Sequence, residues 1–232
     1  MPDTAAKLAA KRQPFPGESK AYQKARTALL AKEIELQRLI DDVAKERRKL
    51  PDGPEIAKDY RFATMNGGDP VGLAELFGAH ETLVAYFWMY GPERSRPCPM
   101  CTNLLGPLDA NAADIEQRAA LVVLGRSPVE RQMAFAQERG WRHLKFAQTI
   151  GDTFALDFGG LDPKKGWEYP VMAVFRKDGG NVRLFWKGAM TGEMADKGKD
   201  PRGGPDIGTV WTVLDMTPEG RGKDWYPKLS YG

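Results

Sequence analysis

Apolar residues follow a helical repeat near the start of the chain. Between residues 19 and 50 they recur at heptad spacing, with Lys32 and Glu46 interrupting the stripe, at Tyr22, Ala25, Leu29, Leu36, Leu39, Val43 and Leu50. A proline at position 51 ends the run. The pattern predicts one long amphipathic helix over residues 19–50, which can pair with its copy in a homodimer or pack on its own chain. The preceding residues 1–18 mix charge with proline and glycine, and we expect a flexible N-terminal arm.

Residues 51–232 alternate apolar runs with glycine and proline breaks. Three kinds of run predict strands: continuous apolar segments at Thr82–Tyr90 and Ala120–Gly125, an extended segment at Trp141–Ile150, and alternating segments at Val171–Arg176 and Val182–Trp186. Glycines between the last two predict a hairpin. We expect helices after Pro99, over Leu108–Ala119, over Val129–Arg139 and around Ile207–Leu214, with a break or a kink at Gly106-Pro107 and a loop over Gly151–Gly166.

The predicted order is β-α-β-α-β-β-α. This order is typical of an α/β fold with a mixed central sheet flanked by helices, here preceded by a long N-terminal helix. The division we expect is an arm at 1–18, the helix at 19–50 and one α/β domain at 51–232.

Charge and composition narrow the function classes. The 232 residues carry 34 Lys and Arg against 31 Asp and Glu, a net charge of +3. This near balance argues against a dedicated nucleic-acid binder or a membrane-surface binder. The first twenty residues lack the apolar run of a secretory signal, and no stretch is apolar enough to span a membrane, so we expect a cytoplasmic protein.

The chemistry concentrates at the chain's two cysteines, Cys98 and Cys101. Pro99 suits the first position of a helix, which places Cys98 at the helix mouth. Unpaired N–H groups there favour a thiolate, and Arg94 and Arg96 can add to this effect if they fold back. Residues three positions apart on a helix lie on one face, within reach of a disulfide. We therefore expect Cys98 to be the nucleophile and Cys101 to be a deeper, resolving thiol.

Two simpler interpretations of the pair remain open. A structural zinc site needs four ligands, and besides the cysteines the chain offers only His80 and His143, which lack metal spacing. Two inert buried cysteines are the other alternative. We favour redox chemistry, with no metal and no cofactor.

Several segments resemble one family. They are ERRKLP at 46–51, YFWMYGPE and CPMC within 86–101, LVVLGRSPVERQMAFAQERGW at 121–141, FALDFG at 154–159 and VWTVLDMTPEGR at 210–221. In this order they resemble the thioredoxin-like proteins grouped as domain of unknown function 899, over nearly the whole chain after the first twenty residues.

The resemblance implies a thioredoxin-like fold and a thiol–disulfide role without a named substrate. Similarity to thioredoxins further implies that Tyr169 and Pro170 form a substrate-binding edge, with Pro170 as a cis-proline facing the dithiol. The sequence departs from thioredoxins at the cysteines, because Pro97 precedes Cys98 and Pro99-Met100 separate the pair. The reduction potential of thioredoxin therefore does not carry over.

These observations lead to three hypotheses. The first is a thiol–disulfide oxidoreductase that acts on a protein or small-molecule thiol or disulfide. The second is a peroxiredoxin-like peroxide reductase in which Cys101 is the reactive cysteine. The third is a non-enzymatic redox-sensing or interaction protein, whose long helix binds a partner while the dithiol reports oxidation.

Overall fold

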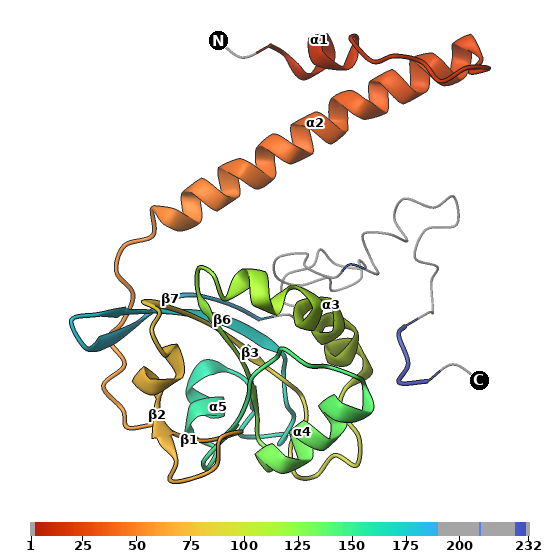
Figure 1. The fold of residues 1–232 in the computed structure, drawn as a ribbon. Helices are drawn as coiled ribbons and strands as arrows, with labels where there is room; N and C mark the ends of the chain where they lie inside the picture. Colours follow the sequence, from red (N-terminus) through yellow and green to blue (C-terminus); the bar gives the residue numbers. More distant parts are fainter. Residues whose placement is uncertain (1–2, 190–208, 210–225, 231–232) are drawn as a thin grey trace. The chain divides into compact units, whose positions relative to one another are not determined.

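The computed structural model describes residues 3–189, 209 and 226–230 (Figure 1). The chain divides into two compact units, Met1–Pro51 and Asp52–Gly232. None of the helices in the described ranges is both long enough and apolar enough to cross a bilayer. The helix predicted around Ile207–Leu214 lies outside the described residues.

The first unit consists of two helices, α1 (Ala5–Ala9) and α2 (Lys20–Arg48). The side chain of Ser19 caps α2 by accepting a hydrogen bond from the Tyr22 N–H at 3.2 Å, and the predicted long helix is confirmed. Helix α1 packs along α2, with Ala5 and Ala9 buried. The segment expected to be a flexible arm therefore contains a helix, and its small alanine side chains let it approach α2 closely.

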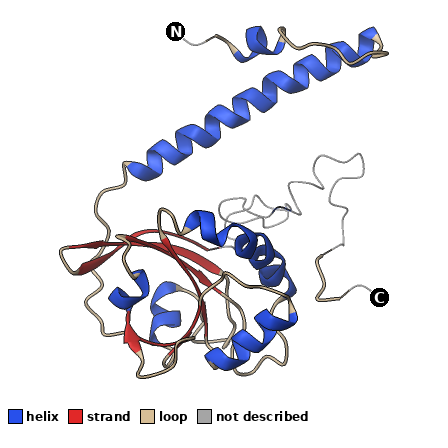
Figure 2. Ribbon diagram, in the orientation of Figure 1, coloured by secondary structure: helices blue, strands red, loops and turns tan. Residues whose placement is uncertain are grey.

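The second unit contains a seven-stranded mixed sheet (Figure 2). Its strands are β1 (Arg61–Thr64), β2 (Val71–Gly72), β3 (Thr82–Phe87), β4 (Ala120–Gly125), β5 (Phe146–Thr149), β6 (Val171–Asp178) and β7 (Asn181–Ala189), in the spatial order β2-β1-β5-β4-β3-β6-β7. The helices are η1 (Leu73–Phe77), α3 (Pro99–Ile115), α4 (Val129–Glu138) and α5 (Thr153–Phe158).

The centre of this sheet has the thioredoxin-like arrangement. Strand β3 leads through α3 into the parallel strand β4, while β6 pairs antiparallel with the other edge of β3. Strand β7 then returns as a hairpin, across a turn in which Gly179 and Gly180 have φ values of 55° and 96°. The fold expected from the sequence is confirmed, with α3 carrying the cysteines next to the central strand.

Helices cover both faces of the sheet (Figure 1), and apolar side chains form a core on each face. Leu83, Ala85 and Phe87 of β3 belong to the core beneath η1 and α5. The alternate residues Val84 and Tyr86 face the core beneath α3 and α4. This double burial explains the absence of polar alternation in the sequence of β3.

Two local predictions need correction. Helix α3 continues through Pro107, so of the break or kink expected at Gly106-Pro107 the break is wrong. Leu105 and Ala112 are buried on either side of this proline, so tertiary packing outweighs its cost. The predicted loop at Gly151–Gly166 contains α5, whose residues Phe154, Ala155 and Phe158 fill the core before Gly159 ends the helix at a φ of 77°. Strands β1 and β2 were not predicted.

Candidate functional site

Cys98 lies at the mouth of α3, at the carboxyl end of β3. It is the residue that caps the helix, and Pro99 occupies the first helical turn, as predicted. The Cys98 N–H donates to the carbonyl of Met89 at 3.1 Å, and the Cys98 carbonyl accepts from the Thr102 N–H at 3.0 Å. These two bonds fix the backbone of Cys98 at the end of the strand, with its side chain near the free N–H groups of the first turn.

The two thiols differ in exposure. Both cysteines are free, Cys98 is partly exposed, and Cys101 is only 2 % exposed. The Cys101 thiol donates a hydrogen bond to the Cys98 sulfur, which is the main reason that the pKa of Cys98 falls from 9.0 to about 6. Burial opposes this shift, while the backbone N–H groups of Cys101 and Met100 and the charge of Arg94 assist it. Cys98 is therefore largely a thiolate at neutral pH.

Cys101 has the opposite character. Burial, followed by its interactions with the Cys98 thiolate, raises its pKa well above the ordinary value. The hydroxyl of Tyr86, a buried residue of β3, hydrogen-bonds the Cys101 sulfur and favours its thiolate. Burial and the nearby sulfurs in turn raise the pKa of Tyr86, so the phenol stays protonated and acts as the donor. The pair thus consists of one accessible thiolate and one buried, protonated thiol.

This difference predicts how the reduced protein titrates. The ultraviolet absorbance of the thiolate is expected to rise with a midpoint near pH 6, as one thiol ionises. In a Cys101→Ser variant a serine hydroxyl replaces the thiol as the hydrogen-bond donor to Cys98, so the midpoint of the transition is expected to shift. The change in absorbance is still expected to correspond to one thiol. A single transition near pH 9 in the wild-type protein would contradict the assignment of Cys98 as the activated thiol.

A buried carboxylate anchors the loop that leads to Cys98. Glu168 is 8 % exposed and accepts hydrogen bonds from the Gly91 N–H at 3.1 Å and from Arg94 Nε at 2.9 Å. Arg126 Nη1 lies 3.4 Å from the other carboxylate oxygen. A Cβ at position 91 would come within 2.3 Å of this carboxylate, so a larger residue there would displace the Glu168 side chain from its contacts. Glu168 therefore holds Arg94 on the dithiol side of the loop.

The other arginine of the loop has a different role. Arg96 forms an ion pair with Glu138 at the end of α4 and lies 4.8 Å above the ring of Phe135. It therefore fixes the loop to α4, and of the two arginines singled out in the sequence it is Arg94 whose charge acts on Cys98.

A pocket of about 410 Å³ opens beside this loop. Met89, whose carbonyl binds the Cys98 N–H, lines it together with Arg94, Arg126, Trp167, Glu168 and Tyr169. The Trp167 side chain is 62 % exposed at the rim, as expected for a tryptophan in a loop. The pocket thus lies between the segment that carries Tyr169 and the end of β3 that holds the backbone of Cys98.

Pro170 directly precedes β6, which runs antiparallel to β3. No peptide bond among the described residues is cis, and the expectation of a cis-proline at Pro170 is wrong. The Tyr169 N–H donates to the carbonyl of Gly160 at 3.0 Å, which fixes the backbone before the proline. The trans bond is also the preferred isomer of an X–Pro bond.

Two residues of the site were missed in the sequence. Tyr86 lies in an apolar run, where a buried tyrosine looks like any other core residue. Glu168 is one acid among many, and it has no motif that marks it. Both act through partners that are distant along the chain, so only the fold reveals them. In the described part of the chain, no three His, Cys, Asp or Glu side chains gather as a metal site.

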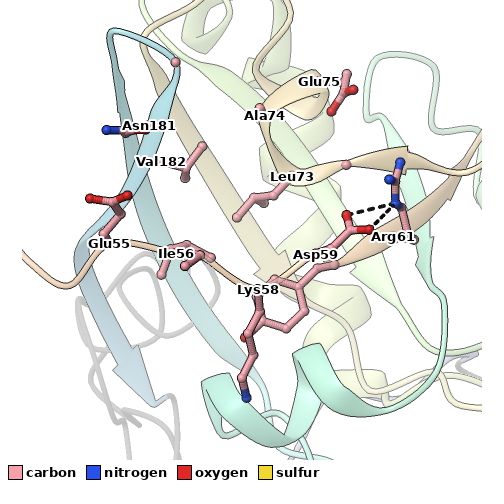
Figure 3. A pocket seen from close by; sticks show the side chains of 14 residues that line it. Glu55, Ile56, Lys58, Asp59, Arg61, Leu73, Ala74, Glu75, Asn181 and Val182 are labelled. Carbon is pink, nitrogen blue, oxygen red and sulfur yellow. Dashed lines mark hydrogen bonds and ion pairs between the residues drawn. The ribbon is translucent and has the colours of Figure 1, made fainter.

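A second pocket, of about 370 Å³, lies near the turn of the β6-β7 hairpin, at the opposite end of β6 from Pro170 (Figure 3). Asp59 and Arg61 pair with each other at its rim, and Glu55 and Lys58 pair with residues outside it. Because these charges are already paired and the cysteines are at the other end of the sheet, we assign the chemistry to the Cys98 end.

Solved structures similar in fold are peroxiredoxins. They include a mutant of peroxiredoxin Q from Xanthomonas campestris, with 16 % identity, a TM-score of 0.42, and coverage of 56 % of this chain and 79 % of that one. The mitochondrial 2-Cys peroxiredoxin of Plasmodium falciparum has 14 % identity and a TM-score of 0.44, and the match covers 71 % of this chain and 90 % of that one. Peroxidoxin BcpB of Mycobacterium tuberculosis has 19 % identity and a TM-score of 0.42, and the match covers 60 % of this chain and 84 % of that one.

Among curated proteins, none matches the sequence. The profile of a family described as "Bacterial protein of unknown function (DUF899)" matches residues 12–231. This match spans the long helix, the cysteine pair and the whole sheet, and it agrees with the resemblance found in the sequence. The chain therefore belongs to the DUF899 family.

Proposed function

We propose that the protein is a thiol–disulfide oxidoreductase with Cys98 as the nucleophile and Cys101 as the resolving thiol. The observation that carries this proposal is the difference between the two thiols. A partly exposed thiol with a pKa of about 6 is hydrogen-bonded to a fully buried thiol one helical turn away, whose pKa is raised. Disulfide exchange requires these two properties: a thiolate that substrate can reach and a second thiol that is protected until it is needed.

In the reducing direction, the Cys98 thiolate attacks one sulfur of a substrate disulfide. The substrate S–S bond breaks, the released thiolate takes a proton from solvent, and a mixed disulfide joins Cys98 to the other half of the substrate. Cys101 then loses its proton and attacks the Cys98 sulfur, which expels the second thiolate. The dithiol has become a disulfide, and its two electrons have reduced the substrate to two thiols.

Tyr86 has a role in the second half of this sequence. Burial keeps Cys101 protonated, and the charge of the Cys98 thiolate adds to this effect. Formation of the mixed disulfide removes that charge and leaves Cys101 with the hydrogen bond from the Tyr86 hydroxyl, which stabilises its thiolate. The buried phenol is therefore a group that helps the resolving thiol to ionise only after substrate has been captured.

The substrate is a protein or small-molecule thiol or disulfide, and we propose that it approaches from the pocket beside Tyr169 and Pro170. Tyr169 lines the pocket with Met89, the residue whose carbonyl binds the Cys98 N–H. The exposed ring of Trp167 offers an apolar surface for the groups next to the substrate sulfur.

Peroxide reduction with Cys101 as the reactive cysteine is less well supported. Cys101 is 2 % exposed and its pKa is raised, so it meets neither of the requirements for an attacking thiolate. If hydrogen peroxide is consumed rapidly by a Cys98→Ser variant, and if that activity depends on Cys101, the order of the two hypotheses is reversed.

Trapping of the mixed disulfide tests the proposal. A Cys101→Ser variant is expected to react with glutathione disulfide and to retain one glutathione on Cys98, detected as an added mass that dithiothreitol removes. The wild-type protein, treated in the same way, is expected to release glutathione and form the Cys98–Cys101 disulfide. A Cys101→Ser variant that forms no adduct would reject the exchange mechanism, and it would leave a redox-sensing or interaction protein as the better interpretation.

A further inference from the structure

Helix α2 has two apolar faces, and α1 covers only one of them. The residues partly covered on the α1 side include Thr27, Leu30, Ile34 and Arg38, and Arg38 also donates to the carbonyl of Asp3 at 2.7 Å. The opposite face is the heptad stripe. Its large side chains, with Ile40 beside them, are 41 to 59 % exposed, which is unusual for so many neighbouring apolar residues: Tyr22, Leu29, Leu36, Leu39, Ile40 and Val43.

Two charged residues interrupt the exposed stripe, and their positions are symmetric. Lys32 lies seven residues before Leu39, and Glu46 lies seven residues after it. Seven residues are two helical turns, or about 10.5 Å along the axis, so both charges lie on the same face as Leu39. Glu46 also pairs with Lys49, but both of those side chains are 69 % exposed, so this ion pair is weak.

This symmetry decides between two ways of pairing α2 with a second copy. In a parallel, in-register pair, Lys32 faces Lys32 of the second copy and Glu46 faces Glu46, so like charges meet twice in the apolar seam. In an antiparallel pair centred on Leu39, each Lys32 faces a Glu46 and the two Leu39 side chains meet at the two-fold axis. Charges of like sign at a seam oppose association, and charges of opposite sign favour it.

We propose that the protein forms a homodimer through α2, in which the two α2 helices pack antiparallel along this stripe and are centred on Leu39. The occupant is a second copy because the part of the stripe between Lys32 and Glu46 is complementary to itself under a two-fold rotation about Leu39, as an isologous interface requires. The stripe lies entirely within the first compact unit, and the proposal does not rest on the redox chemistry of Cys98 and Cys101.

The test uses the full-length chain in analytical ultracentrifugation. The wild-type protein is expected to sediment as a dimer, with twice the mass of the 25.8 kDa chain. The variant Lys32→Glu places glutamate opposite glutamate twice per dimer, and its dissociation constant is expected to rise by about tenfold or more. The double variant Lys32→Glu/Glu46→Lys restores two opposite-charge pairs, and its dissociation constant is expected to return to within about threefold of wild type.

Further variants and measurements distinguish the antiparallel dimer from a monomer and from a parallel dimer. Lys20→Glu makes the same change of charge at an exposed position of α2 outside the stripe, and we expect no change in the dissociation constant. Circular dichroism checks that each variant keeps its helix content. A monomeric wild-type protein would overturn the proposal, as expected if the stripe packs on its own chain. Tight dimers of Lys32→Glu, or a double variant as weak as the single one, would overturn the antiparallel pairing.

Discussion

Replacement of Cys98 by serine is expected to lower the rate of disulfide exchange by about a thousandfold or more. A serine hydroxyl is not ionised at neutral pH, and oxygen cannot take part in exchange with a disulfide, so no mixed disulfide forms. The remaining thiol, Cys101, does not replace it because it is 2 % exposed and its pKa is raised. The rate is measured with glutathione disulfide under excess reductant.

The matched control is the variant at the other cysteine. Cys101→Ser is expected to keep the first, capturing step and to lose turnover, so the two variants fail at different stages. Both substitutions replace sulfur by oxygen, and unchanged circular dichroism spectra would show that the fold is intact. Exchange by Cys98→Ser at more than about a tenth of the wild-type rate would show that Cys98 is not the nucleophile.

The second large effect is expected on stability, at Asp109 of α3. One carboxylate oxygen of this buried side chain accepts hydrogen bonds from the backbone N–H groups of Arg142, His143 and Leu144, at 3.0, 2.8 and 3.0 Å. These bonds tie the cysteine-bearing helix to the segment that enters β5. An Asp109→Ala variant leaves these donors without their acceptor, and we expect the free energy of unfolding to fall by about 2–4 kcal/mol.

Urea denaturation of the two proteins measures this difference. Asp114→Ala is the matched control, because Asp114 is an exposed aspartate on the same helix and its loss is expected to change stability by less than about 0.5 kcal/mol. An Asp109→Ala variant as stable as this control would contradict the role of Asp109 as an anchor of α3.

The contribution of Asp109 to stability is expected to depend on pH. Burial raises the pKa of Asp109, but the backbone donors of His143, Leu144 and Arg142 outweigh burial and lower it overall. An acid whose pKa is lower in the folded state stabilises the fold above its unfolded pKa, which is about 3.9 for Asp. This contribution is lost as the pH falls through the lower, folded pKa. The gap in stability between wild type and Asp109→Ala is therefore expected to be constant near neutral pH and to narrow in acid.

The sequence was sufficient to predict features that local chemistry determines. Pro99 after Cys98 predicted the helix mouth, the apolar run of β3 predicted a doubly covered strand, and Gly179-Gly180 predicted the hairpin turn. In each case a few adjacent residues restrict the backbone strongly, so the local pattern and the fold agree.

Features that depend on distant contacts could not be predicted in this way. The phenol of Tyr86 reaches Cys101 only because β3 and α3 pack face to face. Glu168 binds Gly91 and Arg94 across 77 and 74 residues of chain. Helix α5 was missed because the glycines beside it favoured a loop, whereas its aromatic side chains fill the core. The resemblance to thioredoxins was misleading at Pro170, where the bond is trans.

The central claim, that Cys98 and Cys101 form a reversible redox pair, is tested most directly by the reduction potential. The folded protein is equilibrated with glutathione buffers of graded composition, and its free thiols are counted after acid quenching. We expect a single reversible two-electron transition, with both thiols lost together, at a potential between those of thioredoxin and disulfide isomerase, roughly −270 to −180 mV. Thiols that never pair in any buffer, or that react only after bound zinc is removed, would contradict the account and make the site a structural one.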